Sequence, residues 1–167
     1  MRKKRLIFYF ITFMLICQYS TGVMAISEGQ KNAIVDHCDA IKDNLKMVQR
    51  SDARARVFLG GYYEKILSKY VMPLNVRLVE NNLSEVKLME NQTKIATGKT
   101  TFANDFVGYQ KALEELVLMD CRTKPDKFYD TLVNVRKKRK TVYQDVLKMR
   151  ELMSRNVQLV EELRSKL

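Results

Sequence analysis

Few residues of this 167-residue chain could do chemistry, and the most suggestive pair is His37 followed directly by Cys38. A histidine beside a cysteine could act as base and nucleophile in a covalent mechanism. Neighbours on a helix, however, point about 100° apart, too far to share a hydrogen bond. His37 is the only histidine, and no cluster has the spacing of a zinc or haem site. The sequence therefore predicts no catalytic residue, no metal site and no cofactor, and it disfavours an enzyme.

A run of five basic residues is the strongest charge feature. It consists of Arg136, Lys137, Lys138, Arg139 and Lys140. On a helix, five consecutive side chains wrap around the circumference, so they do not form one flat patch. One interpretation is a solvated segment that pairs with acids on neighbouring helices; the other is contact with an anionic envelope component, a lipid headgroup or an acidic protein. No aromatic residues are interleaved, which disfavours single-stranded nucleic acid as a partner.

The first 25 residues have the three parts of a cleavable signal peptide. A basic start is followed by an apolar run over residues 6–17 and a more polar stretch that ends at Ala25. We expect cleavage after Ala25 and export to the periplasm or out of the cell, with membrane contact only during export. The apolar run is short for a transmembrane helix, which disfavours an uncleaved anchor. Removing Arg2, Lys3, Lys4 and Arg5 leaves 26 basic against 19 acidic residues, a formal charge of +7.

Cleavage would remove Cys17 and leave two cysteines, Cys38 and Cys121. An even pair in an exported protein favours one disulfide, which would stabilise the fold by roughly 4 kcal/mol. If the chain turns back near residue 84, Cys121 lies opposite residue 47 rather than Cys38. The bridge then requires the second helix to end before Cys121 and the connector to run on in extended form. Two free buried thiols are the alternative.

Long helices must position these residues. From Asp126 to the C-terminus, apolar residues recur at spacings of four and three, a repeat typical of helices that pack lengthwise. The series consists of Phe128, Leu132, Val135, Val142, Val146, Met149, Met153, Val160, Leu163 and Leu167. Arg139 and Asn156 occupy its two polar positions. A seam asparagine can fix helix register, whereas a charged seam residue suggests that the bundle is thin or open near Arg139.

Ser27 forms a capping box with Gln30 and begins the first helix. A matching stripe follows, which consists of Ile34, Cys38, Ile41, Leu45, Val48, Ala55, Leu59, Tyr62 and Ile66. We expect one long helix, straight or bent, over this stretch. Ser51 could begin a new helix, but the apolar stripe continues through it in register. The pair at residues 60 and 61, both glycine, predicts close packing or a gentle kink.

Pro73 predicts a kink or break near Val71–Met72, because the residue before a proline disfavours helical geometry. The run ends at the asparagines 81 and 82. Ser84 is expected to cap a second helix, which becomes strongly patterned from residue 102 and stops near Asp120. Pro125 suits the first turn of the final helix. Asn82 and Asn91 also begin N-glycosylation sequons, which matter only in a eukaryote.

Together these elements predict an all-α fold, an elongated antiparallel bundle of three long helices in one domain over residues 26–167, with coiled-coil-like packing. A true break in the first helix would make a four-helix bundle. The expected function is a non-enzymatic binding, scaffold or chaperone-like role in the envelope or outside the cell. In being small, basic, exported and helical the chain resembles periplasmic holdase chaperones, though it shares no motif with them. A secreted cytokine-like ligand, if the source is eukaryotic, and an exported enzyme are the alternatives; monomer or homo-oligomer stays open.

Overall fold

The computed structural model describes residues 26–83 and 85–166. The predicted signal segment (residues 1–25), the predicted cap Ser84 and Leu167 lie outside the described residues. Within them the chain is helical and contains no strand, so the predicted all-α fold is confirmed. In chain order the elements are α2 (Glu28–Asp36), α3 (Cys38–Ile66), the π-helical turn η1 (Leu67–Val71), α4 (Met72–Glu80), α5 (Val86–Leu118) and α6 (Pro125–Arg164).

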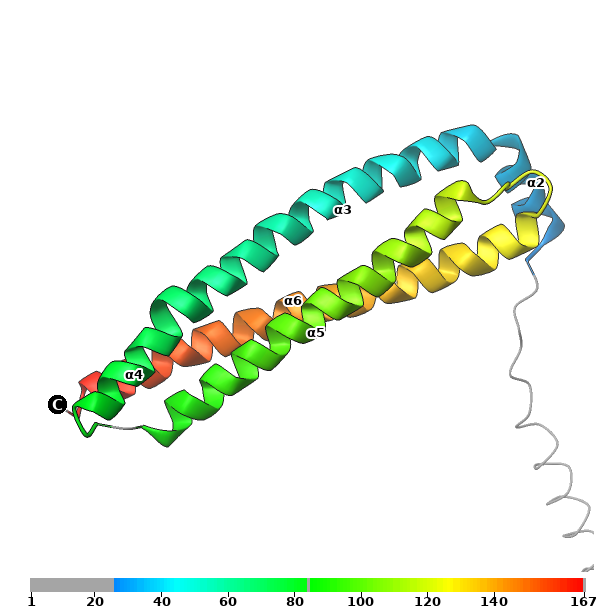
Figure 1. Ribbon diagram of the computed structural model, residues 1–167. Helices are drawn as coiled ribbons and strands as arrows, with labels where there is room; N and C mark the ends of the chain where they lie inside the picture. Colours follow the sequence, from blue (N-terminus) through cyan, green and yellow to red (C-terminus); the bar gives the residue numbers. More distant parts are fainter. Residues whose placement is uncertain (1–25, 84, 167) are drawn as a thin grey trace, which may run out of the picture.

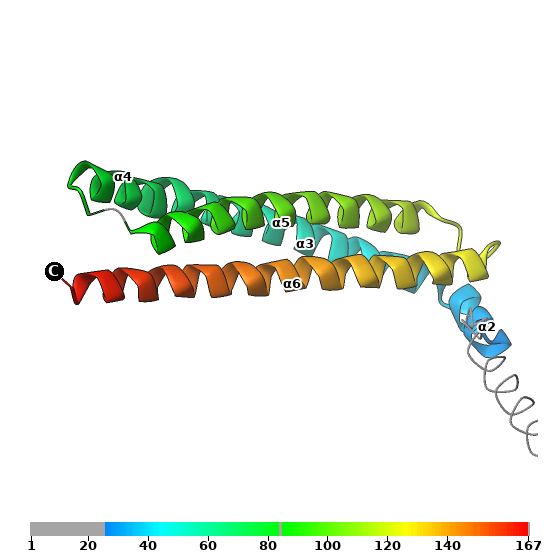
Figure 2. The ribbon, with the colours of Figure 1, turned by 90° about the horizontal axis from the view of Figure 1, so that it is seen from below.

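The helices form the predicted elongated antiparallel bundle. Figure 1 shows α3, η1 and α4 running in one direction, α5 returning and α6 running in the first direction again. Among the described helices, α5 packs against both α6 and α3, whereas α3 and α6 hardly approach each other along their backbones. The turned view shows α6 straight along one side and α2 bent away at one end (Figure 2). α5 is therefore the central helix.

The first helix is divided at His37, so the expectation of one continuous helix from residue 27 to residue 66 is wrong there. α2 ends at Asp36, and the backbone of His37 leaves the helical region, with φ −106° and ψ 18°. The break turns α2 so that it contacts α6, where Lys31 pairs with Asp126 at 3.2 Å. The contact between α2 and α6 thus outweighs the local apolar pattern, which would have continued the helix through His37.

Beyond this break the first helix agrees with the sequence at its cap and at Ser51, but its predicted stripe is wrong at Tyr62, which is 46% exposed while Tyr63 is buried. Ser27 and Gln30 form the predicted capping box, in which the Gln30 backbone N–H donates to the Ser27 hydroxyl and the Ser27 N–H donates to Gln30 Oε1. The helix passes through Ser51 without a new start. Gly60 and Gly61 are also helical, and a Cβ atom at either would meet nothing within 4 Å. Close packing therefore does not explain these two glycines.

The predicted kink before Pro73 takes the form of the π-helical turn η1. Proline has no N–H to donate to the preceding turn of a helix. The Met72 N–H donates to the carbonyl of Leu67, five residues back, so the turn holds one extra residue. The chain bends here without interruption, and both Leu67 and Val71 stay buried.

The first reversal of the chain is closed by an asparagine in the left-handed conformation. Asn82 has φ 58°, a backbone geometry that asparagine tolerates better than most residues. The Leu83 N–H donates to the carbonyl of Leu78 at 2.8 Å. The Asn82 N–H donates to the carbonyl of Val79 at 3.1 Å. This pair of bonds is a Schellman motif, which ends α4 at the predicted place before α5 begins at Val86.

One hydrophobic core runs along most of the bundle. The predicted stripe of α5 is fully buried in it: Phe102, Phe106, Tyr109, Leu113 and Leu116. From α6 it takes every seventh residue between positions 128 and 149: Phe128, Val135, Val142 and Met149. Past Met149 the stripe widens: Leu159 is fully buried, and the predicted Val160 and Leu163 are partly buried beside it. There Leu159 joins a small second cluster with Leu78 of α4 and Leu88 of α5, which meet α6 from another side.

Buried asparagines lie where the two clusters meet. Asn91 of α5 is 4% exposed, and its Nδ2 donates to the Leu152 carbonyl at 3.0 Å and to Asn156 Oδ1 at 3.3 Å. The polar seam position at Asn156 thus has a specific partner, which favours one register of α5 on α6. Burial also closes the Asn91 sequon to a glycan in this fold, whereas Asn82 is exposed.

Candidate functional site

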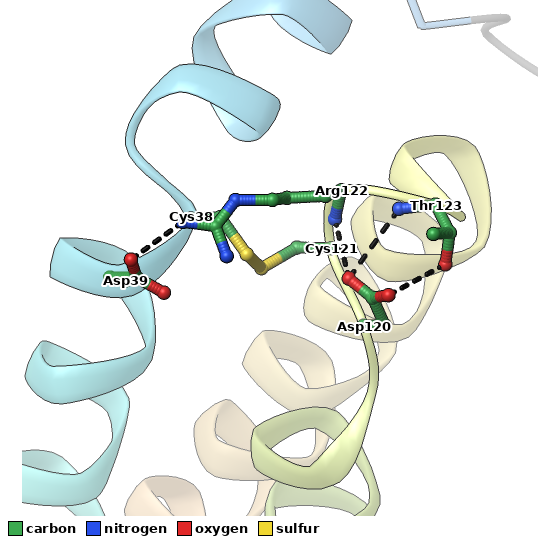
Figure 3. Close-up of a disulfide and its surroundings, with 6 residues drawn as sticks. All are labelled: Cys38, Asp39, Asp120, Cys121, Arg122 and Thr123. Atoms are coloured by element: carbon green, nitrogen blue, oxygen red, sulfur yellow. Dashed lines mark hydrogen bonds and ion pairs between the residues drawn. A yellow bond between two sulfur atoms is a disulfide. The ribbon is translucent and has the colours of Figure 1, made fainter.

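A disulfide joins the two cysteines at one end of the bundle. Cys121 lies in the connector after α5 and bonds to Cys38, the first residue of α3 (Figure 3). Their Cα atoms are 5.7 Å apart, within the normal range. α5 ends at Leu118, before Cys121, as the pairing requires. Both sulfur atoms are in the bridge, so neither residue offers a free thiol, and both residues are buried.

Polar contacts hold the connector around this bridge (Figure 3). The Arg122 guanidinium donates to Asp39, the residue after Cys38, at 2.6 Å. The Asp120 carboxylate accepts from the Arg122 backbone N–H and from the Thr123 hydroxyl, each at 2.9 Å. These hydrogen bonds hold the pKa of Asp120 below its ordinary value. The bridge and its surroundings are therefore a structural clamp.

Arg139, the charged residue in the α6 seam, is bound by Asp52 of α3. Its Nε donates to Oδ2 of Asp52 at 2.8 Å, and its Nη2 donates to Oδ1 at 3.0 Å. The Tyr109 hydroxyl, on α5, donates to Oδ2 of the same carboxylate at 2.7 Å. One carboxylate thus links all three long helices.

The surroundings of Asp52 keep the Tyr109 hydroxyl and the Arg139 guanidinium protonated. Burial, and after it the hydrogen bond to Asp52, raises the pKa of Tyr109 far above its ordinary value. The hydrogen bond to Asp52 likewise raises the pKa of the Arg139 guanidinium. The Asp52 side chain is 15% exposed and that of Arg139 56%, so the guanidinium keeps one side in water.

An open groove of about 560 Å³ adjoins this link, between α3 and α6 and over α5. Its apolar lining consists of Ala55, Leu59, Phe102, Phe106, Val142 and Val146. Its polar lining consists of Asp52, Tyr109, Arg136, Arg139, Lys140 and Tyr143. On each helix most of the polar residues lie nearer the disulfide end than the apolar ones, so the groove has a basic end and an apolar end.

The five side chains of the basic run point in different directions around α6. Arg136, Arg139 and Lys140 line the groove. Lys137 does not, and Lys138 extends along α5, where a Cβ atom at Gly108 would lie 3.9 Å from its Nζ. In the part of the chain that the structure describes, Arg139 is the one member of the run in an ion pair. The run therefore wraps around the helix as expected, and three of its five side chains meet at the groove.

The groove is open because the middle of α3 stays away from α6. Between Cys38 and Tyr63 no residue of α3 is buried. The apolar stripe predicted there is only partly covered, at Ile41, Leu45, Val48 and Leu59. Sequence reasoning found the basic run but missed Asp52 and Tyr109, because the pairing of residues 52, 109 and 139 depends on how three helices align. The charged seam position at 139 was the one available signal.

The remaining candidates for chemistry do not assemble. His37 is exposed in the break between α2 and α3. Asp145 of α6 has a buried Oδ2 with no hydrogen-bond partner, and burial followed by the charge of Asp105 raises the pKa of Asp145. Over residues 26–83 and 85–166, no three His, Cys, Asp or Glu residues gather closely enough to hold a metal ion.

Comparisons of this chain with protein-family models, curated proteins and solved structures found no match. None of the helices that the structure describes is long and apolar enough to cross a membrane. The geometry of the groove is therefore the strongest evidence on function.

Proposed function

We propose that this chain is an exported, non-enzymatic binding protein whose groove between α3 and α6 receives an acidic amphipathic helix of a partner protein. The observation that carries the proposal is the combination of an apolar floor with a basic rim in one open groove. Scaffold and chaperone-like roles both use such binding of a partner segment.

A helical partner suits the groove better than a small molecule. Small-molecule sites usually enclose about 70–90% of the ligand surface, and this groove is open along its length. α3 and α6 each pack on α5 but hardly on each other, which leaves the place of a fourth helix. A helix laid there would cover Leu59 and Val146 and complete a four-helix arrangement. The lining residues of α6 span positions 136–146, about 15 Å or roughly three helical turns.

Charge sets the expected direction and chemistry of the partner. Arg136 and Lys140 lie one turn apart on the rim, and neither is in an ion pair among the described residues. Opposite charge at such a rim speeds association and fixes register. The acidic end of the partner helix should therefore lie toward the disulfide end, with its apolar residues over Phe102 and Val146.

Export is part of the proposal and rests on the sequence of residues 1–25. The capping residue of α2 is Ser27, so cleavage after Ala25 would remove no residue of the described helices. Mass spectrometry of the protein isolated from its native cells should give a chain that begins at Ile26. A chain that retains residue 1 would overturn the export part and leave the groove binding to be tested separately.

Binding can be tested with a labelled peptide helix that carries apolar residues at helical spacing and glutamates at one end. Fluorescence anisotropy should show saturable binding, and a peptide with lysines in place of the glutamates should bind at least about tenfold more weakly. The double variant Arg136→Glu/Lys140→Glu should lose at least about tenfold in affinity for the acidic peptide. Ala55→Trp places a large side chain in the groove and should also lower the affinity at least about tenfold.

The matched control is Lys137→Glu, in the same basic run but outside the groove. It should change the affinity less than about twofold, since it alters long-range charge alone. The single variant Arg136→Glu makes the same change of charge inside the groove and is the direct comparison. Equal loss of affinity in Lys137→Glu and Arg136→Glu would mean diffuse attraction and would refute the groove as the site. Unchanged binding in Ala55→Trp would refute it independently of charge.

No feature described above favours a cytokine-like ligand or an exported enzyme. Cytokine-type bundles have one or two long crossover connections, whereas the connections here span only residues 81–85 and 119–124. The buried Asn91 also removes one of the two sequons that a secreted eukaryotic ligand would use.

A further inference from the structure

The outward face of α3, on the side away from the core, carries large apolar side chains in water. Their exposed fractions are 53% for Met47, 77% for Val57, 73% for Phe58 and 46% for Tyr62. Met47, Phe58 and Tyr62 lie on one stripe, because steps of eleven and four residues are close to whole turns. Phe58 stands beside Gly60 and Gly61, around which a Cβ atom would meet nothing within 4 Å. Met47, Phe58 and Tyr62 therefore form an exposed apolar stripe.

The same face is basic. Between Asp43 and Glu64 the only acidic residue is Asp52, and its carboxylate turns inward to Tyr109 and Arg139. Asp43 and Glu64 are themselves paired, with Lys46 and Lys99. Exposed cations fill the face: Arg50, Arg54 and Lys65, none of which is in an ion pair among the described residues.

We propose that this face of α3 rests on an anionic lipid surface, with Phe58 and Tyr62 in the headgroup region and Arg50, Arg54 and Lys65 against phosphates. Basic residues beside exposed aromatic and aliphatic ones are the pattern of helices that lie in a membrane interface. Anionic headgroups complement the charge, and each basic residue near them adds to binding. A stripe one helix wide offers much less area than a stable protein–protein interface needs, which favours lipid over an acidic protein.

This surface borders the groove, since Tyr62 lies two turns beyond Ala55 on α3, but none of Met47, Phe58 and Tyr62 lines the groove. Ala55 and Leu59 line the groove from one side of α3, whereas Met47 and Phe58 point away from the core. A chain that lies on a membrane through this face keeps the groove open to a partner. If the lipid contact of α3 is refuted, the proposed binding of a partner helix in the groove is unaffected, and the reverse also holds.

The chain contains no tryptophan, so a single introduced tryptophan reports on its own position. Phe58→Trp should show a blue-shifted emission on addition of phosphatidylglycerol-containing vesicles, with quenching by brominated lipid. Vesicles of phosphatidylcholine alone should leave the emission unchanged. Val157→Trp is the matched control, since Val157 is 62% exposed on α6. An equal shift in Val157→Trp, or no shift in Phe58→Trp with either vesicle, would overturn the proposal.

Charge variants separate this face from the overall positive charge. Arg50→Glu/Arg54→Glu in the Phe58→Trp background should lower the partition coefficient at least about tenfold. Lys127→Glu/Lys137→Glu makes the same change of net charge on the exposed surface of α6 and should have a much smaller effect. Circular dichroism of each variant checks that the fold is kept, which exposed positions should allow. Equal losses in the two double variants would assign the binding to net charge and refute the proposed face.

Discussion

Arg139 of α6 and Asp52 of α3 form a two-point ion pair, with Nε–Oδ2 at 2.8 Å and Nη2–Oδ1 at 3.0 Å. In the described part of the chain this pair is the one hydrogen-bonded link between α3 and α6. Tyr109, 1% exposed, completes the arrangement by donating its hydroxyl proton to the same carboxylate. The open groove is therefore held at its basic end by a side-chain bridge.

Removing the Asp52 carboxylate should destabilise the fold mainly through Tyr109. Asp52→Ala leaves that buried hydroxyl without an acceptor and should cost about 1–3 kcal/mol in urea unfolding. Asp52→Asn keeps an acceptor and loses only a partly exposed ion pair, so it should cost less than about 1 kcal/mol. Asp43→Ala, at an exposed position of the same helix, should change stability by less than about 0.5 kcal/mol. Equal losses for Asp52→Ala and Asp52→Asn would contradict this division.

Breaking the disulfide should lower stability by roughly 4 kcal/mol, because the bridge closes a long loop and restricts the unfolded chain. The measurement is urea unfolding of the Cys38→Ser/Cys121→Ser variant against the oxidised protein. Reductant should reproduce the loss in the natural chain and leave the double variant unaffected. A double variant as stable as the oxidised protein would show that the bridge contributes nothing.

Glycines at different places on the bundle should respond to alanine in opposite directions. A Cβ atom at Gly98 would lie 2.6 Å from Sδ of Met149, which is fully buried, so Gly98→Ala should destabilise by about 1–3 kcal/mol. Gly60→Ala meets nothing and should stabilise by about 0.5–1 kcal/mol, since alanine favours the helix. Thermal unfolding compares the two directly. Stabilisation by Gly98→Ala would mean that α5 and α6 lie farther apart than described.

Asp145 should make stability fall as the pH rises out of the acid range. Its pKa is raised in the fold, so above the ordinary carboxyl value of 3.8 the unfolded chain releases its proton first. Stability is then lost until the pH passes the raised pKa, after which the loss is complete. Asp145→Asn should therefore be more stable by about 1 kcal/mol at neutral pH, partly because its amide can donate to a neighbouring carboxylate.

The advantage of Asp145→Asn should vanish below pH 3.8, where the carboxyl is protonated in both states. Asp130→Asn, at an exposed position of the same helix, is the control and should show no such dependence. A pH-independent gain in Asp145→Asn would place its origin in packing instead.

The helices and their packing faces were predictable because apolar spacing depends on local periodicity. The stripe of α5 and the heptad of α6 followed from it, whereas the bend before Pro73 followed from the geometry of proline. The cysteine pairing was predicted from the even number of cysteines left after the expected cleavage, and the length of the connector allowed it. The break at His37 was missed because it depends on α2 packing against α6, a contact without a local pattern.

The groove itself could not be derived from the sequence. A charged residue at Arg139 indicated an opening, but its pairing with Asp52 depends on the relative offset of α3 and α6. The stripe of α3 predicted a buried helix, whereas the middle of α3 is only partly covered. Periodicity shows which face of a helix is apolar, and it does not show how closely a neighbour approaches that face.

The disulfide encloses α3, η1, α4 and α5 in one covalent ring, and α6 lies outside it. A single backbone cut between residues 39 and 120 would leave the two fragments joined through sulfur. A cut in the connector between residues 122 and 124 would leave α6 held by non-covalent contacts alone. α6 is thus the long helix that a second copy of the chain can exchange without breaking any bond, and it is also the helix that carries the basic rim of the groove.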